Sequence, residues 1–458
     1  MGKNSIEHDH IPASCRERKA KRATTAAVAG TFVEYYDFSV YGYVAATLAT
    51  VFFPGQDPAV GLLSTILIFG SAFVVRPLGA IFFGRIGDRK GRRVSLIACI
   101  TCMGAAAGLT GLLPGYAQIG IWAPILLLIL RLLQGFSTGA EFGGAITYIR
   151  EWAPPRRRAF YISFASAAGN VGKALAAGTT ALVASLMPSE AMLNWGWRIP
   201  FLLAVPLGIL VLVLRLRVED SPEFIANNRA RDHAHRPVRD LFATHRAALA
   251  KSILIAVVQN IGTYIGTVFV AVYLSSVLGF SKATSSTIVL VAVLLAAGLI
   301  VAAGQLGTRL GGKRLLLWSY SAYIVLILPS FLLMNQGSIG LAILGLALSM
   351  VPYALCQAGT HTTVPELFPV DVRHTAVAFA YSIGAIIGGG GGPYLATWLI
   401  DATGSPLIPA FMLVIAGALG MIVVSLTVRP TSPNEAHIHT NPHPARPADT
   451  ASTEAGSR

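Results

Sequence analysis

The sequence contains few charged residues. They make up 12% of its 458 residues, whereas about 25% of an average soluble domain is charged. Hydrophobic residues account for 54%, and the mean hydropathy is +0.63. So few charges cannot cover the water-facing surface of a globular protein of this length. The composition therefore argues against an ordinary soluble enzyme or binding domain and favours a membrane protein.

Cysteine is also scarce. The four cysteines, Cys15, Cys99, Cys102 and Cys356, are all predicted to be cytoplasmic or intramembrane, which argues against a disulfide framework. Cys99 and Cys102 share a helix face but have no partner ligands, so no zinc site is expected. The sequence has no nucleophile with a base in context, no metal-ligand set and no phosphate-binding loop, and it predicts neither an enzyme nor a cofactor.

Long apolar runs, by contrast, are abundant. Runs of about 20 apolar residues, the length that crosses a hydrocarbon core of ~30 Å, occur twelve times. Hydrocarbon offers the backbone no hydrogen-bond partners, and alternating ten-residue strands are absent, so each run is predicted to be a helix. The predicted spans are 24–53, 59–83, 94–113, 121–148, 160–187, 199–214, 252–278, 284–308, 315–334, 338–361, 375–400 and 407–428.

The positive charges support this count. With the N-terminus placed in the cytoplasm, thirty of the 35 Lys and Arg residues fall in the two tails and the loops on that side, and only Lys282 falls in an external loop. Short cytoplasmic loops collect Lys and Arg, so both termini are predicted to be cytoplasmic. The net charge of +14 then reflects basic loops against anionic lipid, and nucleic-acid binding is not expected.

The two halves of the chain resemble each other. The loop "GRIGDRKGRR" (84–93) matches "GQLGTRLGGKR" (304–314) at an offset of 220 residues, and "EWAPPRRR" (151–158) matches "ELFPVDVR" (366–373) at 215. Parallel six-helix repeats are the plan of a transporter that rocks around a central site. The sequence predicts an all-α membrane protein with twelve transmembrane helices in two pseudo-symmetric six-helix bundles. Its predicted parts are a cytoplasmic N-terminal tail (1–22), the two bundles (23–217 and 251–428), a cytoplasmic central loop (218–250) and a disordered cytoplasmic tail (429–458).

Polar and charged residues also lie inside the predicted spans. In the fourth and fifth spans they recur at helical spacing and form polar stripes. A charge at the bilayer centre costs roughly 3 kcal/mol, so these groups must face one another or a wet cavity. Three acids stand against three bases, a balance that suggests a shared interior. The acids are Glu34, Asp37 and Glu141, the bases are Arg76, Arg131 and Lys173, and the uncharged candidates are Tyr41, Gln134, Asn170, Asn260 and Tyr264.

These groups also have structural interpretations. Glu34 and Asp37 are predicted to carry protons because intramembrane acids usually mark ion or proton paths, although an ion pair with Arg76 would also explain them. Arg131 and Glu141 fit equally well as anchors that pin the fourth span to its neighbours. The sequence leaves these alternatives open.

The glycine-rich basic loop at 84–93 is predicted to act as a gate. Its glycines permit tight turns at the membrane surface, and Asp88 is predicted to cap the N-terminus of a helix in the other half. Such contacts form only when the cytoplasmic gate is shut. The predicted gating residues are Gly84, Asp88, Arg89, Gly91, Arg92, Arg158, Glu366 and Arg373.

Six motifs follow one another along the chain. They are "EYYDF" (34–38), "RPLGAIFFGRIGDRKGRR" (76–93), "RLLQGFSTGAEFGGA" (131–145), "WGWRIPF" (195–201), "EDSPEF" (219–224) and "PELFPVDVR" (365–373). In this order they resemble the major facilitator superfamily and, within it, the metabolite:proton symporters. The resemblance implies the major facilitator fold and proton-driven uptake of a small polar metabolite across a bacterial inner membrane. Three residues depart from the family pattern: Tyr35 stands where Trp is common, Thr308 replaces the aspartate in the loop of the second half, and Lys173 is not expected.

The main functional prediction is proton-coupled uptake of a small organic acid by alternating access. Glu34 and Asp37, with Glu141 as a third candidate, would take up a proton in the outward-open state, because burial disfavours a charged carboxylate. Arg131 and Lys173 would hold the substrate carboxylate, the former by a two-point fork. Arg76 is a less favoured candidate for the same role.

The sequence leaves the substrate class open. Mono-, di- and tricarboxylates all fit the main prediction, and the alternative is a proline- or betaine-type zwitterion carried with a proton. Osmolyte carriers of the family often end in a heptad-patterned helix, which residues 429–458 lack. From another class, a transporter-like membrane sensor remains possible. The expected partners are the substrate, H⁺ and the lipid bilayer, and the protein is expected to work as a monomer.

Overall fold

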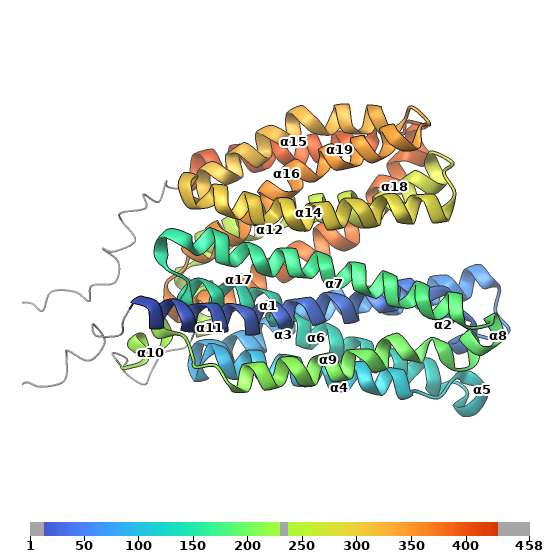
Figure 1. The fold of residues 1–458 in the computed structure, drawn as a ribbon, viewed down its shortest axis with the longest axis horizontal. Coiled ribbons are helices and arrows are strands. Elements are labelled where there is room, and N and C mark those ends of the chain that lie inside the picture. Colours follow the sequence, from blue (N-terminus) through green and yellow to red (C-terminus); the bar gives the residue numbers. More distant parts are fainter. Residues whose placement is uncertain (1–12, 230–236, 429–458) are drawn as a thin grey trace, which may run out of the picture.

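The computed structural model describes residues 13–229 and 237–428, and every regular element within them is a helix (Figure 1). Ten helical segments of this described part are long and apolar enough to cross a membrane. Two more, α1 (Ala13–Tyr43) and α7 (Arg158–Leu186), have 31 and 29 residues, more than the ~20 that a span needs, but are less apolar. The all-α membrane protein predicted from the sequence is confirmed.

The first group of helices packs around its own buried core, which extends from Tyr36 to Ala204. Its long members are α1, α3 (Pro58–Lys90), α4 (Arg92–Leu112), α6 (Trp122–Trp152), α7 and α9 (Arg198–Leu216). Its short members are α2 (Ala45–Phe52), α5 (Tyr116–Ile119), η1 (Pro155–Arg157), α8 (Ser189–Ala191) and η2 (Met192–Gly196). We call this group the first bundle.

The second group, the second bundle, packs around a core that reaches from Leu249 to Val428. Its long members are α12 (Arg246–Tyr264), α14 (Lys282–Leu310), α15 (Gly312–Met334), α16 (Ile339–Glu366), α17 (Val370–Gly384) and α19 (Ile408–Thr427). The first of these continues through η3 (Ile265–Phe269), α13 (Val270–Val272) and η4 (Tyr273–Val277), and α17 continues through η5 (Ala385–Gly391) into α18 (Gly392–Thr403).

The two bundles lie side by side with their long helices roughly parallel (Figure 1). The main contacts between them join α7 to α14 and α3 to α17. The junctions α3–α4, α6–α7 and α14–α15 lie at one end of the molecule, together with α10 (Pro222–Arg229) and α11 (Pro237–Thr244). Since the basic loops gather there, we call it the basic end.

Two segments predicted to be irregular are helical. α1 begins at Ala13 and not near residue 24, because residues 13–22 are rich in the good helix formers Ala, Lys, Arg and Glu. Lys19, in this first part of α1, forms an ion pair with Glu219 at 2.9 Å, which connects α1 to the central loop. That loop, predicted without regular structure, contains α10 and α11. The predicted tail at 429–458 lies outside the described residues.

The loop at 84–93 is also mostly helical. α3 runs to Lys90 and α4 begins at Arg92, so only Gly91 turns the chain, with a positive φ of 114° that favours glycine. The equivalent residue of the second half, Gly311, has a φ of 78° between α14 and α15. The tight-turn prediction therefore holds for Gly91 and is wrong for the other glycines of this loop.

Those other glycines bring the two bundles together. A Cβ atom on Gly84 would lie 2.7 Å from the Cα atom of Thr375, and one on Gly87 would lie 2.7 Å from a ring carbon of His374. Distances under 3 Å are not tolerated by real Cβ atoms, so α3 and α17 can touch only because these positions lack side chains. The small residues of this stretch serve helix contact at the basic end.

Candidate functional site

Midway along the helices, aromatic residues of both bundles meet in a layer that we call the central layer: Tyr35, Phe73, Phe142, Tyr264 and Tyr381. The hydroxyls of Tyr35 on α1 and Tyr381 on α17 form a 3.0 Å hydrogen bond. The ring of Phe142 on α6 lies 4.7 Å from that of Tyr381, and Phe73 on α3 lies 5.9 Å from Tyr264 on α12. The layer joins helices that are far apart in the sequence.

Polar contacts between α7 and α16 continue this layer. The Ser166 hydroxyl lies 2.7 Å from Nδ1 of His361, and the Tyr353 hydroxyl donates to Asn170 Oδ1 at 3.3 Å. The predicted substrate residue Asn170 thus faces the second bundle. Asn260 on α12 instead donates to Gln259 Oε1 at 2.9 Å, within its own bundle.

Glu34 is buried beside the central layer without a hydrogen-bond partner for one of its oxygens. Glu34 is only 3% exposed, and its Oε2 atom has no hydrogen-bond partner within the described residues. Arg76 acts on Glu34 electrostatically, but the Arg76 guanidinium lies over the rings of Phe38 and Phe73 at 4.6 and 4.8 Å. The ion pair between Glu34 and Arg76 that the sequence left open is not formed in the part of the chain that is described.

Asp37 and Arg131 are connected through Gln134. The amide nitrogen of Gln134 donates to both Asp37 oxygens, at 3.1 and 3.3 Å, and its amide oxygen accepts from Arg131 at 2.8 Å. The Arg131 guanidinium also lies 4.3 Å from the Phe38 ring and 4.5 Å from the ring of Tyr41. All these contacts come from the first bundle. The Arg131 guanidinium, which was predicted to hold a substrate carboxylate, is therefore already bound to other groups of the protein.

Glu141 is held by Arg215, which lies one residue beyond the predicted span 199–214. Arg215 lies in the last turn of α9, is 2% exposed, and donates from both terminal nitrogens to the two Glu141 oxygens. Gly30 leaves room for this pair, because a Cβ atom there would collide with the guanidinium. Glu141 therefore has a fixed partner in Arg215, a buried base that the predicted count of three acids and three bases did not include.

This pair leads to a stability prediction. We expect the single variant Arg215→Met to unfold at a markedly lower temperature, because it leaves a buried carboxylate unpaired at a cost of about 3–5 kcal/mol. The double variant Glu141→Gln, Arg215→Met removes both charges and should recover much of that loss. Thermal unfolding of the purified proteins in detergent measures the difference. A single variant as stable as the double variant would contradict the pair.

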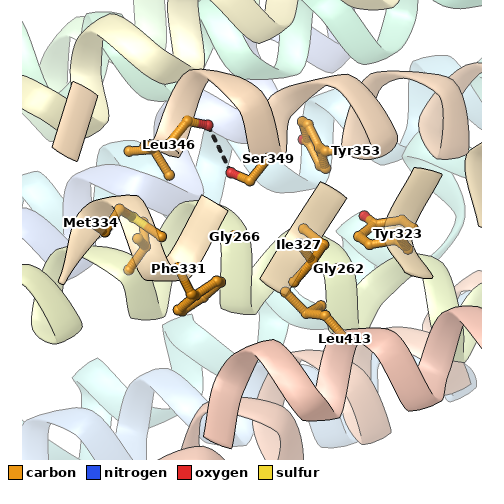
Figure 2. A pocket seen from close by; sticks show the side chains of 11 residues that line it. Gly262, Gly266, Tyr323, Ile327, Phe331, Met334, Leu346, Ser349, Tyr353 and Leu413 are labelled. Carbon is orange, nitrogen blue, oxygen red and sulfur yellow. Dashed lines mark hydrogen bonds between the residues drawn. The ribbon is translucent and has the colours of Figure 1, made fainter. Parts of the chain in front are cut away.

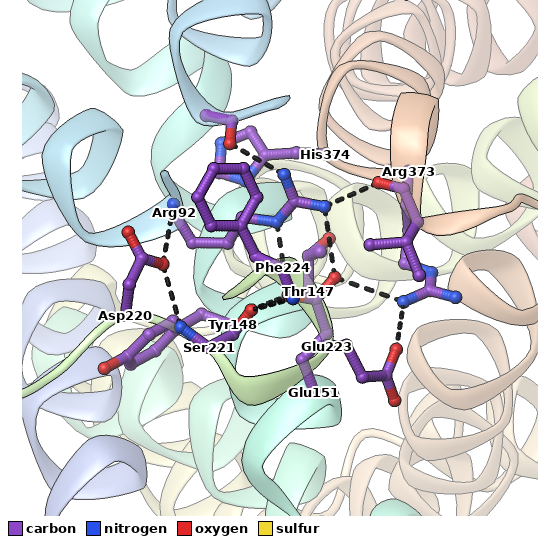
Figure 3. A network of polar contacts seen from close by, with 12 residues as sticks. Arg92, Thr147, Tyr148, Glu151, Asp220, Ser221, Glu223, Phe224, Arg373 and His374 are labelled. Carbon is purple, nitrogen blue, oxygen red and sulfur yellow. Dashed lines mark hydrogen bonds and ion pairs between the residues drawn. The ribbon is translucent and has the colours of Figure 1, made fainter. Parts of the chain in front are cut away.

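At the basic end, Glu151 of α6 joins the two bundles (Figure 3). Arg92 on α4 donates to both Glu151 oxygens at 3.2 Å, and Arg373 on α17 donates to the same carboxylate at 3.1 Å. Arg92 also donates to the Val370 carbonyl at 2.6 Å. One buried carboxylate thus holds bases from both sides of the interface.

Asp88 contacts a helix of the other half, as predicted. Its carboxylate accepts the backbone N–H groups of His374 and Thr375 at 3.2 and 2.9 Å, near the start of α17, and the Thr375 hydroxyl at 2.6 Å. Arg92 lies 3.0 Å away on the other side. The contact between the halves is therefore present, but it falls on the fifth and sixth residues of α17 and does not cap the N-terminus of that helix at Pro369. The role of Asp88 as a gate remains a prediction.

The central loop adds a third part to this network. Glu223 on α10 pairs with Arg158 at 2.7 Å, with Arg373 at 2.6 Å and with Arg150 at 3.4 Å. The carboxylate therefore connects α6 and α7 of the first bundle to α17 of the second. Glu366, another predicted gating residue, acts electrostatically on Arg150 from the end of α16. Arg89 lies in the last turn of α3.

Residues just before α10 complete the contact. The Ser221 hydroxyl donates to Glu151, and Asp220 accepts the backbone N–H of Arg92 at 2.9 Å, which caps the start of α4. Burial raises the pKa of Asp220, although these backbone hydrogen bonds oppose the shift. The ring of Phe224 lies 5.1 Å from the Arg92 guanidinium. The motif "EDSPEF" supplies these residues, and its three acids in a strongly basic part of the chain were the signal that sequence reasoning did not use.

A small cavity lies elsewhere, inside the second bundle (Figure 2). Its lining is mostly apolar, with Tyr323, Phe331 and Leu413 among the side chains, and the Ser349 hydroxyl there donates to the Leu346 carbonyl at 2.7 Å. A second cavity borders the central layer and is lined by His361 and Tyr381, among others. Since the first cavity offers no charged group, the central layer is the better candidate for a polar substrate.

Comparison with known proteins agrees with this architecture. The family model of the Major Facilitator Superfamily matches residues 27–391. The proline/betaine transporter of Salmonella typhimurium is 35% identical over 417 residues, which cover 88% of this chain and 82% of that protein. The Dickeya dadantii glycine betaine/proline/ectoine/pipecolic acid transporter OusA gives the same values. The Corynebacterium glutamicum ectoine/proline transporter ProP is 33% identical over 422 residues, covering 89% and 84%.

Solved structures share the fold. The proton:xylose symporter XylE with bound 6-bromo-6-deoxy-D-glucose superimposes with a TM-score of 0.73 at 17% identity, over 90% of this chain and 95% of XylE. FucP in the outward conformation gives 0.67 at 14% identity, over 89% and 99%. Helix arrangement, family match and relatives point the same way: this chain is a multi-pass membrane transporter that belongs to the major facilitator superfamily.

Proposed function

We propose that the chain carries a small zwitterion of the proline or betaine type into the cell together with a proton. In this proposal the protein is a monomer in a bacterial inner membrane, with the basic end in the cytoplasm. The similarity to proline/betaine and ectoine/proline transporters supports a zwitterion better than the organic acid favoured by the sequence. The single observation that carries the proposal is the position of Glu34. This acid has a carboxylate oxygen without a hydrogen-bond partner in the described residues, and it lies beside the aromatic rings where the two bundles meet.

The chemistry of the central layer suits a zwitterion. A compact zwitterion needs an anion-binding cation and a surface for its positive nitrogen, and aromatic faces bind alkylated ammonium groups well. Tyr35, Tyr264 and Tyr381 supply such faces from three helices. Arg76 lies at the same level, and Asn170 adds a polar side chain. A tricarboxylate would require several cations, yet Arg131 is already engaged with Gln134.

Glu34 and Asp37 are the proposed proton carriers. Both are buried and stand one helical turn apart on α1, so a proton can pass between neighbouring positions on one face. Neither has an ion-pair partner in the described residues, which leaves both free to change charge. Glu141 is a weaker candidate, because its two oxygens are bound by Arg215.

The contacts at the basic end are proposed to be the closed cytoplasmic gate. Asp88, Glu151 and Glu223 each connect the two bundles there. The bundles, residues 23–217 and 251–428, would rock about the central layer, and these contacts would break when the substrate site opens to the cytoplasm. Gly84 and Gly91 belong to the same gate through helix contact and through the turn before α4.

A transport assay tests the proposal directly. We expect purified protein in proteoliposomes to accumulate radiolabelled proline or glycine betaine when an inside-negative potential and an inward proton gradient are imposed. Each charge entering down the potential supplies about 2.3 kcal/mol per 100 mV, enough for more than a tenfold concentration ratio. Collapse of the gradient by a protonophore should abolish accumulation. Uptake that responds to a sodium gradient, or accumulation of citrate or ketoglutarate in preference to both zwitterions, would refute the proposal.

A further inference from the structure

Lys173 is a half-buried cation without a carboxylate partner in the part of the chain that the structure describes. It lies on α7 about 22 Å from the start of that helix, near the level of the central layer. Among residues 13–229 and 237–428, no carboxylate pairs with its ammonium, which lies over the ring of Tyr35 at 5.2 Å from the ring centre. An unpaired charge that is partly removed from water is costly. Its neighbour Asn170, one turn earlier, contacts the second bundle.

The aromatic face under this lysine is held in place from several sides. The Tyr35 hydroxyl is bound by Tyr381, and its ring meets Phe142 edge to face at 5.7 Å. On α7, Gly169 leaves space for the ring: a Cβ atom there would lie 2.9 Å from ring carbon Cδ2 of Tyr35. The ring is therefore a fixed surface, already oriented to receive a cation.

Glu34 determines which charge is favoured beside the Tyr35 ring. It adjoins Tyr35 in the sequence, is buried, and has an oxygen with no hydrogen-bond partner in the described residues. A negative or proton-sharing carboxylate near the ring favours a second cation beside it and disfavours a second anion. A substrate with one positive nitrogen fits this place, and a substrate with two carboxylates does not.

We propose, on the basis of the proposed function, that Lys173 and the substrate exchange places on Tyr35 when a zwitterion binds. In the empty transporter the Lys173 ammonium occupies the face of Tyr35. The substrate carboxylate draws the lysine into a charge-assisted hydrogen bond, and the alkylated ammonium of the same substrate takes the vacated ring face. The number of charges in the layer stays balanced throughout, which neither an anion nor a cation alone achieves.

Three ligands of one shape separate the two halves of this exchange. Glycine betaine has both charges, choline keeps the trimethylammonium group without the carboxylate, and 3,3-dimethylbutanoate keeps the carboxylate with an uncharged carbon in place of the nitrogen. Binding is measured by calorimetry on purified protein in nanodiscs. We expect the wild type to bind glycine betaine at least tenfold more tightly than either analogue, since a hydrogen bond to a charged group contributes about that much.

The variants then assign each charge to its residue. Lys173→Met should weaken glycine betaine about tenfold or more, to the level of choline, while choline binding is unchanged or tighter. Tyr35→Leu should weaken glycine betaine and choline but leave 3,3-dimethylbutanoate unaffected. Lys173→Arg should keep most of the glycine betaine affinity. The matched control Lys251→Met, whose lysine donates to the Thr427 carbonyl at the basic end, should bind all three ligands like the wild type.

Several outcomes would overturn the exchange. Equal weakening of glycine betaine and choline by Lys173→Met would make Lys173 a structural residue, and so would loss of all three ligands. An unchanged glycine betaine affinity would remove it from the site. These results leave the proposed function intact as long as the wild type binds and accumulates zwitterions. A wild type that binds no zwitterion refutes both proposals together.

Discussion

Simultaneous replacement of Glu34 by Gln and Asp37 by Asn is expected to abolish concentrative uptake of the substrate. Without these two carboxylates on α1, the region beside the central layer no longer gains and loses a proton as the transporter changes sides, so the proton gradient cannot be coupled to transport. Exchange of internal for external substrate needs no net proton movement and should continue. The measurement is a pair of assays in the same proteoliposomes: gradient-driven accumulation and counterflow. Accumulation should fall to the equilibrium level.

The single variants should differ in severity. Glu34 has a buried oxygen without a partner, whereas both oxygens of Asp37 accept from Gln134. We therefore expect Glu34→Gln to lose more accumulation than Asp37→Asn. A suitable control is Glu190→Gln, in the short helix α8 at the end of the molecule opposite the basic end. Gradient-driven accumulation by the double variant would remove both acids from the coupling mechanism.

Replacement of Asp88 by Asn is expected to give the second large effect, on the gate. The carboxylate is fully buried, accepts three hydrogen bonds from His374 and Thr375, and faces Arg92. The amide of Asn turns N–H donors toward groups that are themselves donors. It also leaves Arg92 with one fewer buried counter-charge, and breaking a buried ion pair in this way destabilises the state that contains it by about 3–5 kcal/mol. The closed state should lose population, and the turnover rate should fall by tenfold or more, while equilibrium substrate affinity changes little.

Accessibility of the basic end measures this shift. A single cysteine introduced at Ala378, which packs against Gly143 across the interface, should react with a membrane-impermeant thiol reagent from the basic side faster in Asp88→Asn than in the wild type. The background is a variant without native cysteines. Glu223→Gln is the graded comparison: its carboxylate is 21% exposed, so solvent screens its pairs and the effect should be smaller. Normal turnover together with unchanged labelling in Asp88→Asn would show that Asp88 is no part of a gate.

Some predictions about the charged residues were confirmed and others were not, for one physical reason. A helical stripe fixes which residues of a helix share a face, but the rotation of that helix against its neighbours decides what they touch. Glu141 was placed on a polar stripe of its helix, yet its partner Arg215 is 74 residues away and lies just outside the predicted span 199–214. Asp88 was predicted to contact a helix of the other half, and its carboxylate accepts backbone N–H groups of α17, but not at the N-terminus of that helix.

Tertiary structure alone reveals the central layer. Tyr35 and Tyr381 are 346 residues apart, and nothing in either local sequence indicates their hydrogen bond. The same holds for Glu223, which lies in a loop that the sequence predicted to lack regular structure but which connects Arg158 to Arg373. These side chains contact residues of distant segments, and such segments come together only when the two bundles pack.

The amino-acid sequence by itself determined the class of the protein, its long helices and the internal repeat. Those follow from local rules: hydrocarbon thickness sets the length of a span, and the cost of unpaired backbone groups in lipid requires a helix. The choice of partner for each buried charge, the helical form of the central loop and the aromatic layer were decided only by the tertiary structure. The reason is that an ion pair or a ring contact depends on distances of a few ångströms between helices, and sequence spacing does not encode the rotation that sets those distances.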